Sequence, residues 1–508
     1  MATARLVRLC VAALLGTHLA GSGAVGAETF GLAVSTPATT KGDPFEIYTG
    51  GSLKSAVFDG LTQVALTGEV TPALALSWRA VNDTTWVFNL RPGVTFSDGT
   101  PVTAAGVAEL LAFLRSAEAR RYWMAQQWDG LAGARALDEL TLKITTVKPD
   151  PLIPRRASLL RVIDLGTWRK KGETGFADAP VATGPYRVVS WGPNASAIKL
   201  AAVPGAWRAP KAVSAVEMKV ITDGTRRIQA LLSNEVQLAV NLDPDGLGPL
   251  EAAGLKTVVV PNPIVVGIAL RTVNAAGSPL LDVRVRRALN YAVNKSVISE
   301  QIMQGLMPIA SQGVTAGTVG HNPNIAPYPY DPDKARALLA EAGYPNGFSL
   351  VVGVWTGQVP GDALMFQQVA QDLGRVGVRA ELRAIPFTDF SRRLLTGDWE
   401  GIAAVSLNWT ARNMLDGWAA MEAFSCQRIP LAVFCDAEVD AALNLARHEM
   451  DPAVRDAKLQ QAMAAAVAAA PSIFLVNYAD IVAMRPDVQG YVVRSDGILF
   501  ENITFAGE

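Results

Sequence analysis

The chain has 508 residues, more than one compact hydrophobic core usually serves, so we expect two or more domains. Half of the residues are hydrophobic, 18% are charged, and the formal net charge is −1 without any basic tract. This balance is that of a globular protein, and it argues against a nucleic-acid partner.

The first 27 residues have the organisation of a secretory signal peptide. Arg5 and Arg8 precede a short apolar run at residues 9–19, and the small residues 25–27 form a cleavage site. The apolar run is too short to span a bilayer. Cys10 lies at the start of this run instead of after it, which argues against a lipoprotein. We therefore expect a soluble, exported protein that does not span the membrane.

Residues 71–107 predict a β-hairpin followed by a helix. Residues 85–91 alternate large apolar and polar side chains, as in a strand with one buried face. Residues 76–79 form the partner strand across a turn at 81–84. Thr103 stands at an N-cap position before a helical run at 104–116.

Further along the chain, strands and helices alternate, which indicates a mixed sheet covered by helices. We expect a helix after Asp282 with Val285, Ala288, Leu289 and Ala292 on its buried face, and interpret Arg284, Arg286 and Arg287 as a solvated flank. Asp331 and Gly343 bound another helix. The other expected strands are 186–191, 212–221, 236–241, 265–272, 349–354, 378–384 and 473–478, and the other helices are 225–233, 363–376 and 437–470, the last interrupted at residues 451–452.

Four stretches of the sequence carry a family resemblance, one of which is the segment 279–295 with the helix after Asp282. Residues 72–107 read PALALSWRAVNDTTWVFNLRPGVTFSDGTPVTAAGV, residues 182–191 read ATGPYRVVSW, and residues 330–344 read YDPDKARALLAEAGY. In residue order they resemble the family 5 extracellular solute-binding proteins, the peptide, nickel and opine receptors of bacterial ABC importers. The resemblance implies an α/β, two-lobed periplasmic-binding-protein fold of type II (cluster C-like), with an extra subdomain in the large lobe.

On this resemblance the chain divides into four parts. Residues 1–27 are the signal peptide, and residues 28–274 form the first part of the large lobe, with 62–181 as an inserted subdomain. Residues 275–478 form the second lobe, and residues 479–508 return to the large lobe. The two crossings are therefore expected near Asn274 and Tyr478.

The function that the resemblance implies is capture of a solute by hinge closure and delivery to an inner-membrane ABC permease with its ATPase subunits. We expect a monomer without a cofactor or a bound metal, whose ligand is a short peptide or a peptide-like solute with a carboxylate. A nickel chelate or an opine is the alternative. An exported hydrolase is a more distant one, because no P-loop, G-x-G-x-x-G, H-E-x-x-H or G-x-S-x-G occurs and only His321 and His448 follow the signal peptide.

The candidate ligand loop is residues 408–416, after a strand expected through 399–407. In the peptide receptors that this chain resembles, a tryptophan in this loop lines the cleft, and an aspartate shortly after it pairs with the α-amino group of the ligand. Here Trp409 matches that tryptophan, while Arg412 occupies the expected aspartate position and Asp416 is the next carboxylate. We expect Asn408, Trp409, Arg412 and Asp416 at the ligand, and Trp418 in the core.

Arg271 stands at a strand end where many relatives have asparagine. Together with Arg412 it could hold a ligand carboxylate through paired charge-assisted hydrogen bonds. The alternative for each arginine is an ion pair with a neighbouring acid. After removal of the signal peptide only Cys426 and Cys435 remain, and an even pair in an oxidising compartment predicts one disulfide.

Overall fold

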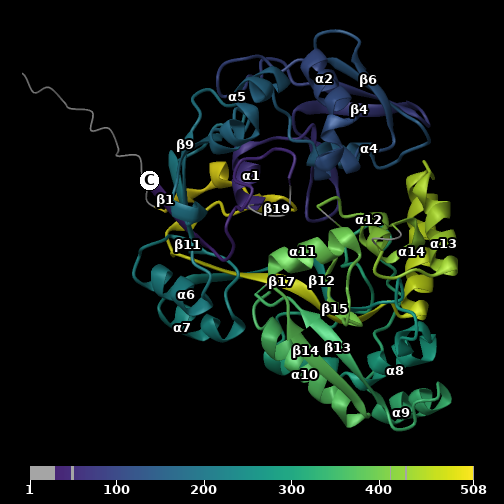
Figure 1. Cartoon of the computed structure of the whole chain (residues 1–508). Coiled ribbons are helices and arrows are strands. Elements are labelled where there is room, and N and C mark those ends of the chain that lie inside the picture. Colours follow the sequence, from purple (N-terminus) through teal and green to yellow (C-terminus); the bar gives the residue numbers. More distant parts are fainter. Residues whose placement is uncertain (1–28, 47–50, 358, 412, 429–431, 507–508) are drawn as a thin grey trace, which may run out of the picture.

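The computed structural model describes residues 29–46, 51–357, 359–411, 413–428 and 432–506 (Figure 1). The expected signal peptide and Arg412 lie outside the described residues. Within these ranges, no helix has both the length and the apolar character needed to cross a membrane.

One mixed sheet of eleven strands runs through the molecule, in the order β14-β13-β15-β12-β17-β11-β1-β10-β9-β8, with β16 paired to β12 beside this path. Its strands are β1 (Thr29–Val34), β8 (Tyr186–Trp191), β9 (Ala197–Ala202), β10 (Ala215–Val220), β11 (Leu238–Ala239), β12 (Lys256–Leu270), β13 (Phe348–Val354), β14 (Val378–Ala384), β15 (Ala404–Ser406), β16 (Trp409–Thr410) and β17 (Ser472–Met484).

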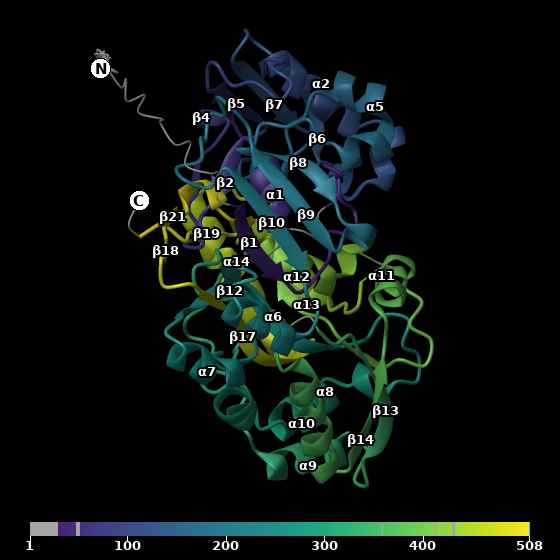
Figure 2. The ribbon, with the colours of Figure 1, turned by 90° about the vertical axis from the view of Figure 1, so that its left-hand side faces the viewer.

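Two long antiparallel strands, β12 and β17, join the two halves of this sheet (Figures 1 and 2). The last residues of β17 pair with β11, which pairs with β1, whereas the second half of β12 pairs with β15 and β16. Their ladder shifts register between Pro261 and Val265. Pro261 and Pro263 have no N–H to donate, which accounts for the interruption.

Above the main sheet in Figure 1 lies a separate four-stranded antiparallel sheet in the order β4-β5-β7-β6. Its strands are β4 (Ala75–Asn82), β5 (Thr85–Leu90), β6 (Leu131–Ala136) and β7 (Thr141–Thr146). The predicted hairpin is confirmed as β4–β5, and Thr103 caps α2 (Ala104–Leu114) by accepting a hydrogen bond from the Gly106 N–H. Helices α4 (Ile153–Leu159) and α5 (Leu165–Asp178) flank this sheet.

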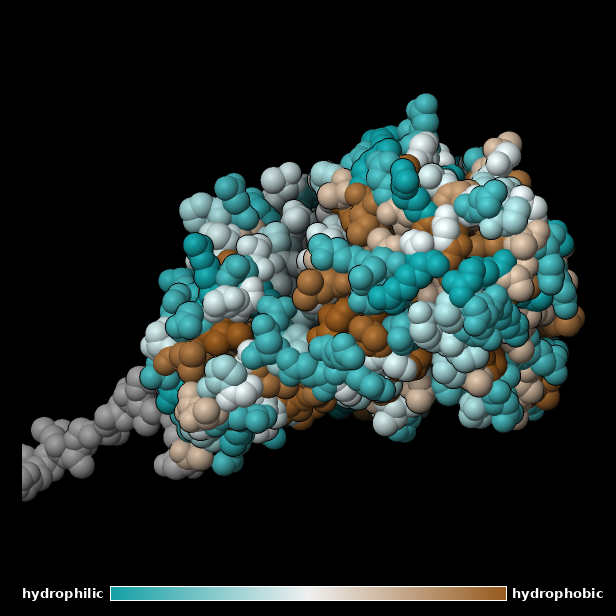
Figure 3. All heavy atoms as spheres, turned by 90° about the horizontal axis from the view of Figure 1, so that it is seen from below, coloured by the Kyte–Doolittle hydropathy of each residue, from teal (hydrophilic) through white to brown (hydrophobic). Residues whose placement is uncertain are grey.

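Apart from the short α3 (Trp123–Gln126), ten further helices surround the two halves of the main sheet in the described part of the chain. They are α1 (Gly51–Val57), α6 (Gly224–Leu232), α7 (Leu247–Ala252), α8 (Val283–Ala292), α9 (Pro332–Glu341), α10 (Asp362–Arg375), α11 (Phe387–Thr396), α12 (Gly417–Met421), α13 (Ala437–Arg447) and α14 (Pro452–Ala469). Helices α8, α9 and α10 pack against β13 to β15, and α6 and α7 pack beside β1 and β11. The face seen from below Figure 1 is largely hydrophilic, with hydrophobic side chains gathered near its middle (Figure 3).

The predicted face of α8 is confirmed, because Val285, Ala288, Leu289 and Ala292 are all buried. The interpretation of Arg286 as part of a solvated flank is wrong. Its side chain is buried and donates hydrogen bonds to the carbonyls of Ala469, Leu280 and Leu281. The long helix expected at 437–470 is indeed two helices, since Asp451 caps α14 and Pro452 begins it.

Candidate ligand site between the lobes

The two halves of the molecule touch through the loop after β16. Arg155 on α4 donates one hydrogen bond to the Met414 carbonyl, at 2.6 Å, and another to the Gly68 carbonyl, at 2.8 Å. The Ser495 hydroxyl bonds to the carbonyls of Val64 and Asn413. The loop that the sequence singled out therefore lies at the contact between the lobes.

Trp409 is a core residue in this conformation. Its side chain is buried, and its ring stacks on Phe424 with centroids 3.8 Å apart. Its Nε1–H donates to the Ser472 hydroxyl at 2.8 Å. Gly313 packs so closely that an added Cβ would lie 2.0 Å from the indole ring. Ligand contact by Trp409 stays a prediction, as does that of its partly buried neighbour Asn408.

Asp416 is fully buried and its carboxylate is held within the protein. Arg455 on α14 donates to both oxygens, at 2.6 and 2.9 Å, and the Trp418 N–H at the start of α12 donates a third bond. Burial alone would raise the pKa of Asp416, but Arg455 holds it below its usual value. In this conformation the carboxylate is committed to Arg455 and α12, so its role at the ligand stays a prediction.

Arg271 follows the last residue of β12, whereas Trp409 pairs with Val265 in the middle of that strand. Val265 pairs with Trp409 and Arg271 follows six residues later, which corresponds to roughly 20 Å along a strand. Its guanidinium donates to the carbonyls of Trp399, Ile402 and Val273, and burial lowers its pKa to about 10. It lines a separate surface cavity of about 760 Å³. The structure therefore does not bring Arg271 together with the loop at Trp409.

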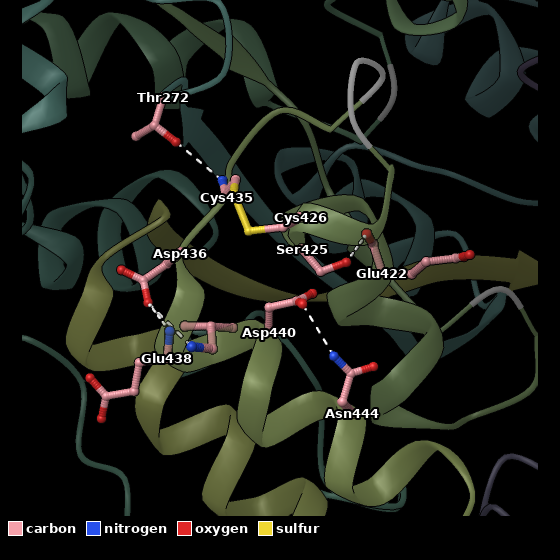
Figure 4. Close-up of a disulfide and its surroundings, with 10 residues drawn as sticks. Thr272, Glu422, Ser425, Cys426, Cys435, Asp436, Glu438, Asp440 and Asn444 are labelled. Carbon is pink, nitrogen blue, oxygen red and sulfur yellow. Dashed lines mark hydrogen bonds between the residues drawn. A yellow bond between two sulfur atoms is a disulfide. The ribbon is translucent and has the colours of Figure 1, made fainter.

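The predicted disulfide is present between Cys426 and Cys435 (Figure 4). The Cys435 N–H donates to the Thr272 hydroxyl, next to the end of β12. Asp436 then caps α13 by accepting from the N–H groups of Glu438 and Val439. The bridge thus fixes the chain between the ligand loop and α13.

A group of buried charges in the first lobe was not recognised from the sequence. Arg161, after α4, is 5% exposed, and Lys54 on α1 is 1% exposed. Burial and, to a smaller extent, the neighbouring charge of Arg161 lower the pKa of Lys54 to about 7, against the attraction of Asp43 and Glu46. No motif marks these residues, because the chain folds them together from separate segments.

The charges around Arg161 border a small cavity at the lobe contact. Asp59, Ser158, Arg494 and Asp496 line it from the first lobe, and Asn413 lines it from the ligand loop. The charges of Asp496, Arg494 and Asp59 act on Arg161, and Val162 is bonded through its N–H to the Asp59 carbonyl. Residues of both lobes therefore meet at this cavity, next to the buried Arg161, which is not itself among the lining residues.

The main sheet consists of two groups of strands that β12 and β17 join. The loop after β16 contacts the other half of the molecule. This arrangement is that of a two-lobed α/β binding protein. Residues 69–429 match the model of the bacterial extracellular solute-binding proteins, family 5. The chain belongs to this family. Among the described residues, no group of three or more His, Cys, Asp or Glu side chains is placed to hold a metal ion.

Three known proteins show how far the similarity extends. The glutathione-binding protein GsiB of Pectobacterium atrosepticum is 29% identical over 432 residues, which are 81% of each chain. NikZ from Campylobacter jejuni, solved with Ni(L-His), aligns with a TM-score of 0.81 at 20% identity over 94% of this chain and 99% of its own. DppA from Helicobacter pylori, solved with the peptide STSA, aligns with 0.78 at 22% identity over 94% and 98%. The two-lobed type II fold expected from the sequence is confirmed.

Proposed function

We propose that this chain is the exported, periplasmic receptor of an ABC importer, which captures a short peptide or peptide-like carboxylate solute by closure of its lobes and delivers it unaltered to a membrane permease. The observation that carries the proposal is the contact of the loop before Asp416 with Arg155 and Ser495 of the other lobe. A ligand enclosed there touches both lobes only in the closed state, and its differential affinity stabilises that state.

The hinge of this motion is the interrupted pairing of β12 and β17. Pro261 lies opposite Ala479 and Val265 opposite Asn477, and between these pairs the ladder is broken. Few hydrogen bonds resist bending there, so rotation about this level needs little disruption of either lobe. On this proposal the first crossing lies before the boundary expected near Asn274, and the second lies close to Tyr478.

The peptide class of ligand is supported by the relative described as a glutathione-binding protein, which aligns over four fifths of both chains. Glutathione is a tripeptide with two carboxylates and one ammonium group, and its two carboxylates equal in number the positive groups of Lys54 and Arg161.

A binding panel with the mature protein tests the proposal. Glutathione, trialanine, nickel–histidine and an opine are titrated by calorimetry, and small-angle scattering is recorded with and without each compound. We expect binding of glutathione or trialanine, a smaller radius of gyration in the complex, and recovery of the unaltered compound. Binding of nickel–histidine or the opine alone would replace the peptide by the other ligand classes, and turnover of a probe would replace the receptor by an enzyme.

A further inference from the structure

We propose that Arg161 is the anion anchor of the ligand site, where its guanidinium binds a carboxylate of the solute, with Lys54 behind it as a second positive charge. This inference rests on the proposed function, because it assigns the carboxylate of the captured solute to a residue of the first lobe. It replaces neither Trp409 nor Asn408 as predicted contacts of the second lobe.

The first observation is that Arg161 is buried without a partner. No hydrogen bond or ion pair joins its guanidinium to any residue in the described part of the chain, although the residue is only 5% exposed. A buried charge without a partner is costly, and proteins normally pair such groups. A cost of this kind is retained where a ligand completes the site.

The second observation is that other buried arginines do not behave this way. Besides Arg161, the described residues include four buried arginines, Arg227, Arg271, Arg286 and Arg455. Arg227, Arg271 and Arg286 each donate to backbone carbonyls, and Arg455 pairs with Asp416. Each of these four guanidinium groups thus has hydrogen-bond acceptors within the protein, and Arg161 is the exception among the buried arginines of the described residues.

The third observation is that the nearest carboxylates are already engaged. Asp59 accepts hydrogen bonds from the Thr183 hydroxyl, the Trp207 indole and the Arg208 guanidinium, each at 2.9 Å. Asp496 accepts two bonds from Arg494, at 3.0 and 3.2 Å. Both attract Arg161 from a distance but neither contacts it, so the counter-charge must come from outside the described protein atoms.

The fourth observation is the position of the pair. Asp59 and Asp496, whose charges act on Arg161, line the small cavity that also receives Asn413 from the ligand loop, while Arg161 and Lys54 are not among its lining residues. Lys54 lies close enough to Arg161 for their charges to repel, and its Nζ has no hydrogen-bond partner. One anion placed between them would relieve both charges. The planar fork of a guanidinium suits a carboxylate, which accepts two parallel hydrogen bonds.

The test compares free acids with amides. Glutathione, trialanine and the C-terminal amide of each are titrated against the wild-type protein and the Arg161→Met and Arg161→Lys variants. We expect wild-type protein to prefer an acid over its amide by about tenfold to a hundredfold, the contribution of hydrogen bonds to a charged group. Arg161→Met loses this preference, and Arg161→Lys retains part of it.

The control is Arg169→Met, which removes the same charge from an exposed pair with Glu109 on the first lobe. It leaves the preference unchanged. An equal loss of affinity for acids and amides in Arg161→Met, or an unchanged preference, overturns the assignment of Arg161.

A readout without ligand separates this inference from the proposed function. Replacing an unpaired buried charge by an apolar side chain of similar length removes its desolvation cost, so Arg161→Met should raise the melting temperature of the ligand-free protein. If none of the compounds binds the wild-type protein, the proposal of a peptide ligand is wrong. The melting temperature of ligand-free Arg161→Met then decides alone whether Arg161 is an anion-binding residue. A lower melting temperature shows a structural arginine and overturns the inference.

Discussion

Arg455 and Asp416 form a buried ion pair that holds the ligand loop to α14, with nitrogen–oxygen distances of 2.6 and 2.9 Å. Neither side chain is more than 6% exposed. Because Asp416 also caps α12, one carboxylate connects the loop after β16, the helix that follows it and α14. The loop is therefore fixed on its second-lobe side, and its other contacts reach the first lobe.

Removing this carboxylate should be strongly destabilising. The Asp416→Asn variant leaves the guanidinium of Arg455 buried without its counter-charge, and we expect the free energy of unfolding to fall by about 3–5 kcal/mol. Urea denaturation followed by circular dichroism measures this loss. Asp389→Asn, which removes a carboxylate from an exposed pair on α11, is the control and should have a much smaller effect. Equal effects of the two variants would contradict the central role of Asp416.

Arg155 should stabilise the closed arrangement. The Arg155→Gln variant loses the hydrogen bond from α4 to the Met414 carbonyl of the second lobe, and also the bond to the Gly68 carbonyl within the first lobe. We expect the ligand-free variant to have a larger radius of gyration by small-angle scattering, because fewer contacts hold the lobes together. The exposed Arg79 on β4 provides the control variant Arg79→Gln. An unchanged radius for Arg155→Gln would show that these bonds do not favour closure.

The disulfide should stabilise the segment between the ligand loop and α13. Its cysteines are nine positions apart, and a loop of this length predicts a loss of about 2–3 kcal/mol when Cys426 and Cys435 are both changed to serine. Hydrogen exchange should increase most near the start of α13, where Asp436 caps the helix. A loss of protection spread evenly over both lobes would instead indicate a global role.

Asp480 beside the hinge should make stability depend on pH. Burial raises its pKa to about 6, against the hydrogen bond from the Asn241 N–H, the charge of Arg227 and the hydroxyl of Tyr478. The charge of Asp480 in turn contributes to the raised pKa of Tyr491. Because the folded state holds the proton more tightly than the unfolded state, this contribution is fully present below about pH 4 and is lost as the pH rises through 6.

The Asp480→Asn variant removes this titration. We expect the wild-type free energy of unfolding to lose about 2–3 kcal/mol between pH 4 and pH 7 through this group, and the variant to lack that loss. Urea titrations at several pH values measure both curves, with Asp331→Asn on the exposed cap of α9 as the control. Parallel curves for the wild-type protein and Asp480→Asn would show that another group is responsible.

Much of the local structure follows directly from neighbouring residues. The hairpin of β4 and β5, the cap at Thr103 and the division at Pro452 were predictable because each depends on residues within a few positions of one another. The start of β12 at Lys256 was not predicted, because Pro261 and Pro263 argue against a strand. In the folded protein, pairing with β17 keeps the segment around these prolines in a strand. The strand expected through 399–407 is only Ala404–Ser406.

The candidate site was predictable in part. The sequence identified the loop at Trp409 and the cysteine pair, but it assigned Arg271 to the same site, although β12 carries that residue six positions beyond the pairing of Val265 with Trp409. It also could not show that Asp416 is committed to Arg455, which lies 39 positions away.

By itself the sequence determined the family, the alternation of strands and helices and the caps that bound them, because these depend on the order of residues and on short-range patterns of polarity. Only the tertiary structure decided which charges are neutralised. Asp416 receives a partner and Arg161 does not, and both outcomes depend on segments that meet only after the chain has folded, where burial makes the presence or absence of a counter-charge energetically decisive.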